Sequence, residues 1–246
     1  MSGIARPRLP EPGPEDHKYS RGLVAVVGGD MRGAAALAAL GAARAGAGYV
    51  QLAAPERASG LPFAIVQRDF VDLADKRIGA IVVGPGLGGA DPLRALTAGR
   101  PLVVDAEAIM AFENSAGAAI LTPHEGEYAR RWPQLEGSRS ERAAAAARET
   151  GAVIVLKGAR TVVAALDGRV SVAAPAPHAL ATAGTGDVLA GVCGAMLAQL
   201  GDPFLAAQAA VWLHAEAARL TPAPFVADDL LAHLPAAVRS CWCQKP

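Results

Sequence analysis

The sequence predicts an α/β fold in which a mostly parallel central sheet is covered by helices on both faces. From Arg21 onward, short runs of β-branched and aliphatic residues alternate with Ala-rich segments of helical composition. The strand-like runs are apolar throughout, which indicates burial on both faces of a sheet. With 246 residues, 52% of them hydrophobic, the chain is long enough to bury one large core, so one domain is expected.

The predicted elements follow one another along the chain. The expected strands are Leu23–Val27, Tyr49–Ala53, Ala80–Val83, Leu102–Val104, Ala119–Leu121 and Val153–Leu156. The expected helices are Ala34–Ala45, Val188–Leu200 and Pro203–Leu220, and a hairpin is predicted around Asp167-Gly168, between Thr161–Leu166 and Val170–Val172. Because ligands bind at the carboxyl edge of open parallel sheets, we expect the polar residues that follow these strands to converge on one rim.

The two ends of the chain differ in composition from its middle. Residues 1–20 are rich in Pro, Gly and charge, lack an apolar signal region, and are predicted to be a flexible lead-in. Residues 21–238 are predicted to be a single catalytic domain, and residues 239–246 a solvated tail. The long hydrophobic runs are Ala-rich and broken by Gly, which disfavours a membrane span. Three cysteines lack the spacing of a disulfide framework, so a reducing, cytoplasmic location is expected.

The charge balance argues against a nucleic-acid partner. Lys and Arg number 23 and so do Asp and Glu, and no Lys/Arg-rich run provides an electrostatic footprint for DNA or RNA. Any recognition of phosphate must therefore come from backbone amides, helix ends and a few placed cations.

The strongest motif is Ala183-Gly184-Thr185-Gly186-Asp187, which precedes an apolar helical segment. Small residues at a helix start leave backbone N–H groups free to hold an anion, and the helix dipole supports this. Asp187 falls in the first turn, where it could take a proton from a substrate hydroxyl. The alternative is an ordinary first-turn carboxylate, which the small residues on both sides and the long helix behind disfavour.

Two further motifs follow buried strands. Lys157 and Thr161, in Lys157-Gly158-Ala159-Arg160-Thr161, suit the phosphates and ribose of a nucleotide, although a solvated strand end would look the same in isolation. In Thr122-Pro123-His124-Glu125-Gly126-Glu127, Glu127 projects from the start of a helix and could hold a water of a Mg²⁺ ion. For this segment a helix-capping acid and a structural histidine remain the alternatives.

Glycine-rich loops follow two other strands. Gly84-Pro85-Gly86-Leu87-Gly88-Gly89 suits close approach of backbone to a ligand, and a plain tight turn suits it equally. Gly28-Gly29-Asp30 forms a similar entrance to the first main helix. The dinucleotide fingerprint, the Walker-A lysine loop and the Gly-x-Ser-x-Gly elbow are absent from the sequence.

Taken in order, these segments resemble the ADP/ATP-dependent NAD(P)H-hydrate dehydratases of the ribokinase-like superfamily. The resemblance runs from about His17 to about His233, through the loop at 84–88 and the segments at 121–124, 157–161 and 183–191. It implies a nucleotide-dependent dehydration of (6S)-NADHX and NADPHX to NADH and NADPH, in which the C6 hydroxyl is phosphorylated and phosphate then leaves. Bacterial members generally use ADP and release AMP; the sequence leaves open the choice of ADP or ATP, and of NADHX or NADPHX.

The resemblance also implies roles for particular residues. Asp187 is the base, and the amides around Gly184, Thr185 and Gly186 stabilise the transferring phosphoryl group. The implied nucleotide-binding residues are Lys157, Gly158, Ala159, Arg160, Thr161 and Gly186. The implied residues at the hydrate site are Ala34, Gly86, Gly88, His124 and Asp187, with Glu127 contacting Mg²⁺ through water. Relatives are often tetramers, and many carry a fused epimerase, so we expect a separate epimerase to act with this chain.

This sequence departs from the family pattern at three positions. Glu107 and Met110 stand where Asp and Asn are common, and Glu125 replaces the usual Pro after His124. The main alternative is a small-molecule kinase of the same superfamily, acting on hydroxyethylthiazole, hydroxymethylpyrimidine or a sugar with the same Asp187. A non-enzymatic nucleotide-binding protein is a second alternative, which the retained Lys157, His124 and Asp187 disfavour.

Overall fold

The computed structural model describes residues 2–69, 71–114 and 118–243. Within these residues, ten strands form one sheet in the order β1-β11-β10-β9-β8-β7-β6-β3-β4-β5. The strands are β1 (Ser2–Gly3), β3 (Leu23–Val27), β4 (Tyr49–Ala53), β5 (Ile65–Arg68), β6 (Ile78–Val83), β7 (Leu102–Val104), β8 (Ala119–Leu121), β9 (Val153–Leu156), β10 (Val162–Ala164) and β11 (Val170–Val172).

The strand directions confirm a mostly parallel sheet. All neighbours from β5 to β9 in the sheet are parallel, whereas β10 is antiparallel to both β9 and β11. The predicted hairpin is therefore confirmed as β10–β11. Five of the six predicted strands have the predicted bounds, and β6 begins at Ile78 instead of Ala80. Strand β5 was not predicted, because its short sequence Ile-Val-Gln-Arg at the sheet edge carries little apolar signal.

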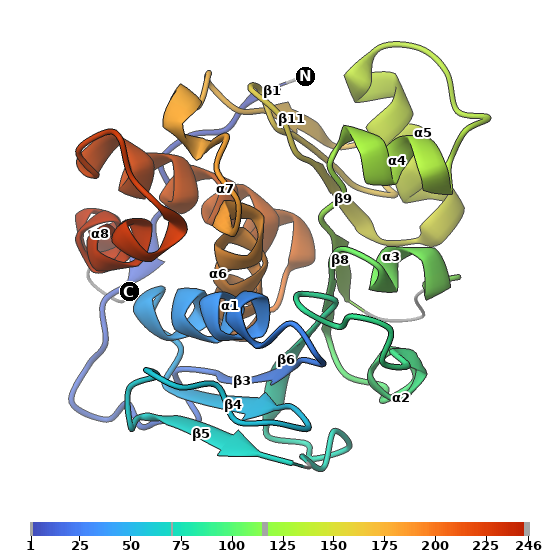
Figure 1. Ribbon diagram of the computed structural model, residues 1–246. Helices are drawn as coiled ribbons and strands as arrows, with labels where there is room; N and C mark the ends of the chain where they lie inside the picture. The colour runs from blue at the N-terminus through green and yellow to red at the C-terminus, as the bar shows by residue number, and fades with distance from the viewer. Residues whose placement is uncertain (1, 70, 115–117, 244–246) are drawn as a thin grey trace.

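Helices cover both faces of the sheet, as predicted (Figure 1). One layer contains α1 (Arg32–Arg44), α6 (Thr185–Leu200), α7 (Pro203–Leu220) and α8 (Ala227–Ser240). The other contains α2 (Leu93–Leu96), α3 (Ala108–Ala111), α4 (Glu125–Arg131) and α5 (Arg139–Thr150). A short 3₁₀ helix, η1 (His178–Leu180), precedes α6. Over the described residues, no helix has both the length and the apolar character that a membrane crossing requires.

The two helical layers explain why the strands are apolar at every position. In β3, Val24 and Val26 pack into the core beneath α1 and α6, while Leu23 and Ala25 pack into the core on the opposite face. All four are at most 1% exposed. Since each buried aliphatic side chain contributes roughly 1.5–3 kcal/mol relative to exposure, both faces select for apolar residues.

Both ends of the chain take part in strand pairing, which was not predicted from the sequence. Strand β1 pairs with β11, and β2 (Leu9–Pro10) pairs with β12 (Trp242–Cys243). Leu9 and Cys241 are buried in the core that contains α8, so apolar contacts hold the two ends together. The prediction for residues 244–246 lies outside the described residues.

Candidate active site

The carboxyl ends of five neighbouring strands, β3, β6, β7, β8 and β9, meet at one edge of the sheet. Backbone hydrogen bonds connect the segments that follow them. Gly29 N donates to Gly86 O at 3.1 Å, and Lys157 N donates to Pro123 O at 2.8 Å. Between these two pairs, a Cβ added to Gly84 would lie 1.8 Å from Asp105 O, so the segments that follow β6 and β7 are in contact as well. The rim predicted from the sequence is therefore present, at the side of the sheet where ligands bind in this class of fold.

The start of α6 presents free backbone amides to this rim. Its N-cap, Gly184, has φ 87°, and no side chain caps the helix. The first backbone bond of the helix runs from Val188 N to Gly184 O, and Thr185 N donates to Thr182 O at 3.5 Å. The amides of Gly186 and Asp187 are therefore left without a backbone acceptor. At Gly184 any side chain would be strained, and a Cβ would lie 2.6 Å from Leu37 Cδ1. This geometry fits the predicted anion site.

Asp187 lies in the first turn of α6, beside a group of buried charges. Burial is the largest cause that raises the pKa of its carboxyl to about 6, and the negative charge of Asp105 adds to it. Lys157 acts in the opposite direction, whereas Glu107 and Glu127 raise the pKa further. A carboxyl with a pKa near 6 is ionised at neutral pH and is a stronger base than an ordinary aspartate, as proton abstraction requires.

Lys157 is held inside the acidic group by an ion pair. Its Nζ donates to Asp105 Oδ1 at 2.8 Å and lies 3.8 Å from Glu127 Oε2. Thr122 Oγ1 donates to the same Asp105 oxygen at 2.7 Å. Burial acts to lower the pKa of Lys157, but Asp105 and Glu127 outweigh it and hold the pKa above its usual value. Lys157 therefore stays a cation in front of Gly186, whose added Cβ would lie 3.4 Å from Nζ.

His124 and Glu127 form a capping box at the start of α4. His124 Nδ1 accepts from Gly126 N and Glu127 N, and the Glu127 carboxylate accepts from His124 N at 2.8 Å. The two alternatives left open by the sequence, a structural histidine and a capping acid, are thus both confirmed. Because Nδ1 accepts two bonds, the neutral ring carries its proton on Nε2, which faces Glu127 Oε1 at 3.3 Å. The ring is half-exposed, so its capping role is compatible with the predicted substrate contact.

A cavity of about 280 Å³ opens beside the start of α6. Of the residues predicted to bind nucleotide, Lys157, Gly158, Ala159, Thr161 and Gly186 line it, whereas Arg160 is exposed outside it. The opposite wall is largely apolar and includes Leu180, Leu189, Val211 and His214. The cavity therefore has a polar side next to the amides and an apolar side behind it, the usual composition of a small-molecule site.

His214, inside α7, also belongs to this site, although it was not predicted from the sequence. Its Nε2 lies 2.9 Å from Thr185 O, so it contacts the turn that carries the free amides. Burial lowers the pKa of His214 to about 4, which keeps the ring neutral at pH 7. An isolated histidine in an Ala-rich helix gives no sequence signal, since only the packing of α7 against α6 shows what it touches.

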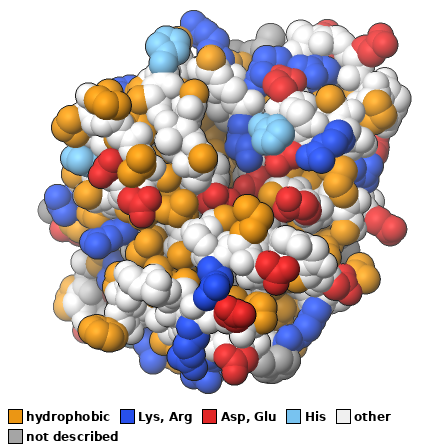
Figure 2. Space-filling model, viewed as in Figure 1, with side chains coloured by type: hydrophobic (Ala, Val, Ile, Leu, Met, Phe, Trp, Pro, Cys, Tyr) orange, Lys and Arg blue, Asp and Glu red, His pale blue; other side chains and the backbone are white. Residues whose placement is uncertain are grey.

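Three of the residues predicted for the hydrate site, Ala34, Gly86 and Gly88, lie on the β3–β6 side of the rim, whereas His124 follows β8 and Asp187 lies in α6. Gly86 is buried, and a Cβ there would lie 2.2 Å from Met31 O at the start of α1. Gly88 is exposed next to Asp30, and Ala34 is half-buried in the first turn of α1. Gly86 and Gly88 of the Gly-rich loop therefore pack against Met31 and Asp30, as the tight-turn alternative expects, and this packing is compatible with a ligand beside the loop. In the space-filling view, acidic side chains gather in a hollow at the centre of this face, with basic side chains beside it (Figure 2).

The raised pKa of Asp187 predicts a pH-dependent cost in stability. Its folded-state pKa, about 6, lies above the ordinary pKa of an aspartate, 3.8, so the folded protein binds the proton more tightly. The contribution of Asp187 to the free energy of unfolding is therefore fully present below about pH 4 and is lost as the pH rises through about 6. Asp187→Asn should raise the free energy of unfolding by about 1–3 kcal/mol at pH 8 and by much less at pH 4. Urea denaturation at both pH values measures this, and an equal change at both would contradict it.

The fold and the site together define a class of protein. A parallel sheet covered on both faces, with a Gly-Thr-Gly-Asp turn at a helix start on its carboxyl edge, is the arrangement of the ribokinase-like proteins. A ribokinase-like protein of Enterococcus faecalis shares the fold, with a TM-score of 0.82 and 23% identity over 97% of this chain and 93% of that one.

The comparisons with known sequences identify the family within this class. The family described as NAD(P)H-hydrate dehydratase matches residues 24–238, and this chain belongs to it. The crystal structure of an ADP/ATP-dependent NAD(P)H-hydrate dehydratase from Bacillus subtilis, co-crystallised with ATP/Mg²⁺, is 34% identical, with a TM-score of 0.81 over 95% of both chains. A bifunctional NAD(P)H-hydrate repair enzyme of Gloeobacter violaceus is 42% identical over 88% of this chain. The chain covers 49% of that enzyme, so it spans about half the length of such bifunctional relatives.

Proposed function

We propose that this chain catalyses the nucleotide-dependent dehydration of (6S)-NADHX and NADPHX to NADH and NADPH. ADP, or ATP in its place, donates the phosphoryl group. The observation that carries the proposal is the position of the Asp187 carboxylate, in the first turn of a helix whose free amides face the rim. A base for a hydroxyl and a site for the transferring phosphoryl group are thereby combined at one helix start.

The residues around the cavity have different proposed roles. Lys157, Gly158 and Thr161 receive the phosphates and ribose of the nucleotide, and the apolar wall receives its base. Asp187 removes the proton from the C6 hydroxyl as its oxygen bonds to the terminal phosphorus, and AMP leaves when ADP is the donor. The phosphate then departs with the C6 oxygen, and loss of a proton restores the double bond. The free amides at the start of α6, that of Gly186 among them, stabilise negative charge on the transferring group, which is usually the largest contribution in such reactions.

The donor groups of the site fit a magnesium ion held mainly by phosphate and water. Among the described residues, no group of three or more His, Cys, Asp and Glu side chains is placed to hold a metal by itself. Mg²⁺ keeps several waters and is commonly bound through one or two carboxylates plus substrate phosphates, so no protein cage is needed. Glu127, whose side chain is 7% exposed, is the carboxylate we propose to contact such a water. The ion would neutralise charge on the nucleotide phosphates.

We also propose a partner enzyme, an oligomeric state and a cellular location for this protein. The bifunctional names of several relatives support a functional link to an epimerase that interconverts the two hydrate epimers. A homotetramer is proposed from the family resemblance alone, and a cytoplasmic location from the cysteine pattern of the sequence.

A direct assay separates this function from the kinase alternative. Purified protein is incubated with NADHX, Mg²⁺ and either ADP or ATP, and the absorbance of reduced nicotinamide is followed. We expect recovery only when a nucleotide is present, and the better nucleotide identifies the donor. Folded protein that binds nucleotide but gives no recovery with either one would refute the dehydratase, and would favour a small-molecule kinase with the same Asp187 base.

A further inference from the structure

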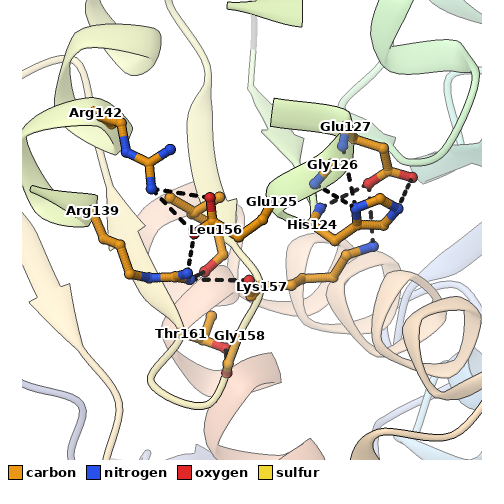
Figure 3. A network of polar contacts seen from close by, with 10 residues as sticks. All are labelled: His124, Glu125, Gly126, Glu127, Arg139, Arg142, Leu156, Lys157, Gly158 and Thr161. Atoms are coloured by element: carbon orange, nitrogen blue, oxygen red, sulfur yellow. Dashed lines mark hydrogen bonds and ion pairs between the residues drawn. The ribbon is translucent and has the colours of Figure 1, made fainter. Parts of the chain in front are cut away.

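Three segments around the nucleotide side of the site are joined by one cluster of charged side chains (Figure 3). Arg139, the first residue of α5, donates from Nη2 to Leu156 O and to Lys157 O, both at 3.0 Å. Its Nη1 donates to Glu125 Oε1, at the start of α4. Arg142, one turn further along α5, donates to both oxygens of Glu125, at 3.2 and 3.0 Å. Neither arginine nor Glu125 was assigned a role from the sequence or by the family resemblance.

The two carbonyls that Arg139 binds lie where strand β9 ends. On one side, the last pair of the ladder with β10 joins Leu156 to Val162. On the other side, Lys157 N is held by Pro123 O. Beyond these bonds the chain leaves the sheet. The Arg139 guanidinium then donates to the two carbonyls in place of the N–H groups that a further strand would provide. Arg139 thereby fixes the backbone immediately before the residues that line the cavity.

The glycine at 158 makes this contact possible. A Cβ added to Gly158 would lie 2.6 Å from Arg139 Nη2 and 3.0 Å from its Cζ, so the guanidinium lies directly against the glycine backbone. Gly158 also lines the cavity, which places Arg139 behind the loop that the nucleotide contacts. Glu125 in turn holds Arg139 in place, and it stands where the resembled family commonly has proline.

We propose that Arg139, oriented by Glu125, is a positioning residue that holds the backbone of Leu156–Gly158 in the geometry required for nucleotide binding. The proposal rests on the proposed function, since it takes residues 157–161 as the nucleotide site. Arg139 acts through the backbone, so its effect depends on the forked guanidinium and not on positive charge alone. Lysine keeps the charge but has a single nitrogen, which cannot donate to both carbonyls and to Glu125 in the same geometry.

Calorimetric titration with ADP tests the proposal in the absence of the hydrate. Arg139→Gln should weaken ADP binding by about tenfold, the loss expected when a charge-assisted hydrogen bond is removed. Arg139→Lys should weaken it by at least about threefold, because a single nitrogen cannot keep both carbonyl contacts together with the Glu125 contact. Binding of NADHX, measured without nucleotide, should change by less than about twofold in both variants. Arg148→Gln, an exposed position in the last turn of the same helix, is the matched control and should bind ADP as the wild type does.

Glu125→Gln supplies a second, milder test. Gln keeps an acceptor at position 125 but removes the charge that orients Arg139. ADP binding should therefore weaken, but by less than in Arg139→Gln. Combined with Arg139→Gln it should have no further effect, because both act on the same contact. If Arg139→Gln does not fold, Arg139→Lys and Glu125→Gln decide the question by the same titrations.

Two results would overturn the positioning role of Arg139, and a third would refute the nucleotide site on which it rests. Wild-type affinity in Arg139→Lys together with weak binding in Arg139→Gln would show that charge alone matters, and would overturn the proposal. Equal losses of ADP and NADHX binding would assign Arg139 a general structural role, which also overturns it. A wild-type protein that does not bind ADP would refute the nucleotide site itself, so failure of the proposed function is recognised before any variant is compared.

Discussion

Replacing Asp187 with Asn is expected to lower kcat for nucleotide-dependent recovery of NADH by about 10²–10⁴-fold, the usual contribution of a positioned general base. Asn has nearly the same shape but cannot accept the hydroxyl proton. The free backbone amide of Gly186 and the cation of Lys157 are unchanged, so the dissociation constant for ADP should stay within a few-fold. Steady-state kinetics and calorimetric titration of ADP measure the two quantities separately.

A matched control makes the result specific to the site. Asp228→Asn changes the same residue type in the first turn of α8, where the side chain is exposed, and should leave kcat unchanged. The pH profile gives a second check, because the wild-type rate should fall as the pH drops below about 6, where Asp187 becomes protonated. If ADP binding is lost together with turnover, Asp187 holds the nucleotide and is not the base.

Most of the sheet and the position of the rim could be predicted from the sequence, because each depends on local patterns. Continuous apolar runs such as Val153–Leu156 are long enough to specify buried strands, and the residue after each run falls at the carboxyl edge by geometry alone. Gly184 and Asp187 could be placed in the same way, since a helix start with small residues leaves its amides free. The short helices α2 and α3 could not, because four residues carry no periodic signal.

The contacts that the sequence did not reveal all join residues far apart in the chain. Asp105 and Lys157 are separated by 52 positions, and His214 lies 29 positions from Thr185. A single sequence shows that such residues are polar, but it does not show which of them meet. The pairing of Leu9–Pro10 with the segment after α8 was not predicted for the same reason, since the Pro-rich composition near Leu9 gave no sign of it.

The second large effect concerns the buried ion pair at the centre of the rim. Lys157→Met keeps the apolar stem but removes the charge, leaving Asp105, which is 2% exposed, next to Glu127 without a compensating cation. Breaking a buried pair by removing one partner typically costs about 3–5 kcal/mol. We expect a loss of that size in the free energy of unfolding by urea denaturation at pH 7. Lys76→Met, at an exposed lysine, is the control and should cost less than about 0.5 kcal/mol.

A second substitution, which removes the opposing charge at Asp105, distinguishes the structural role of Lys157 from its role in nucleotide binding. Asp105→Asn combined with Lys157→Met removes both charges while Thr122 Oγ1 can still donate to the side-chain oxygen at 105. The double variant should regain most of the stability, because an uncompensated buried charge is no longer present. Its affinity for ADP should remain low, since the cation facing Gly186 is absent, whereas NADHX binding should be less affected. If the double variant regains ADP affinity along with stability, Lys157 acts only by holding the fold; if NADHX binding suffers more than ADP binding, the two subsites are assigned the wrong way round.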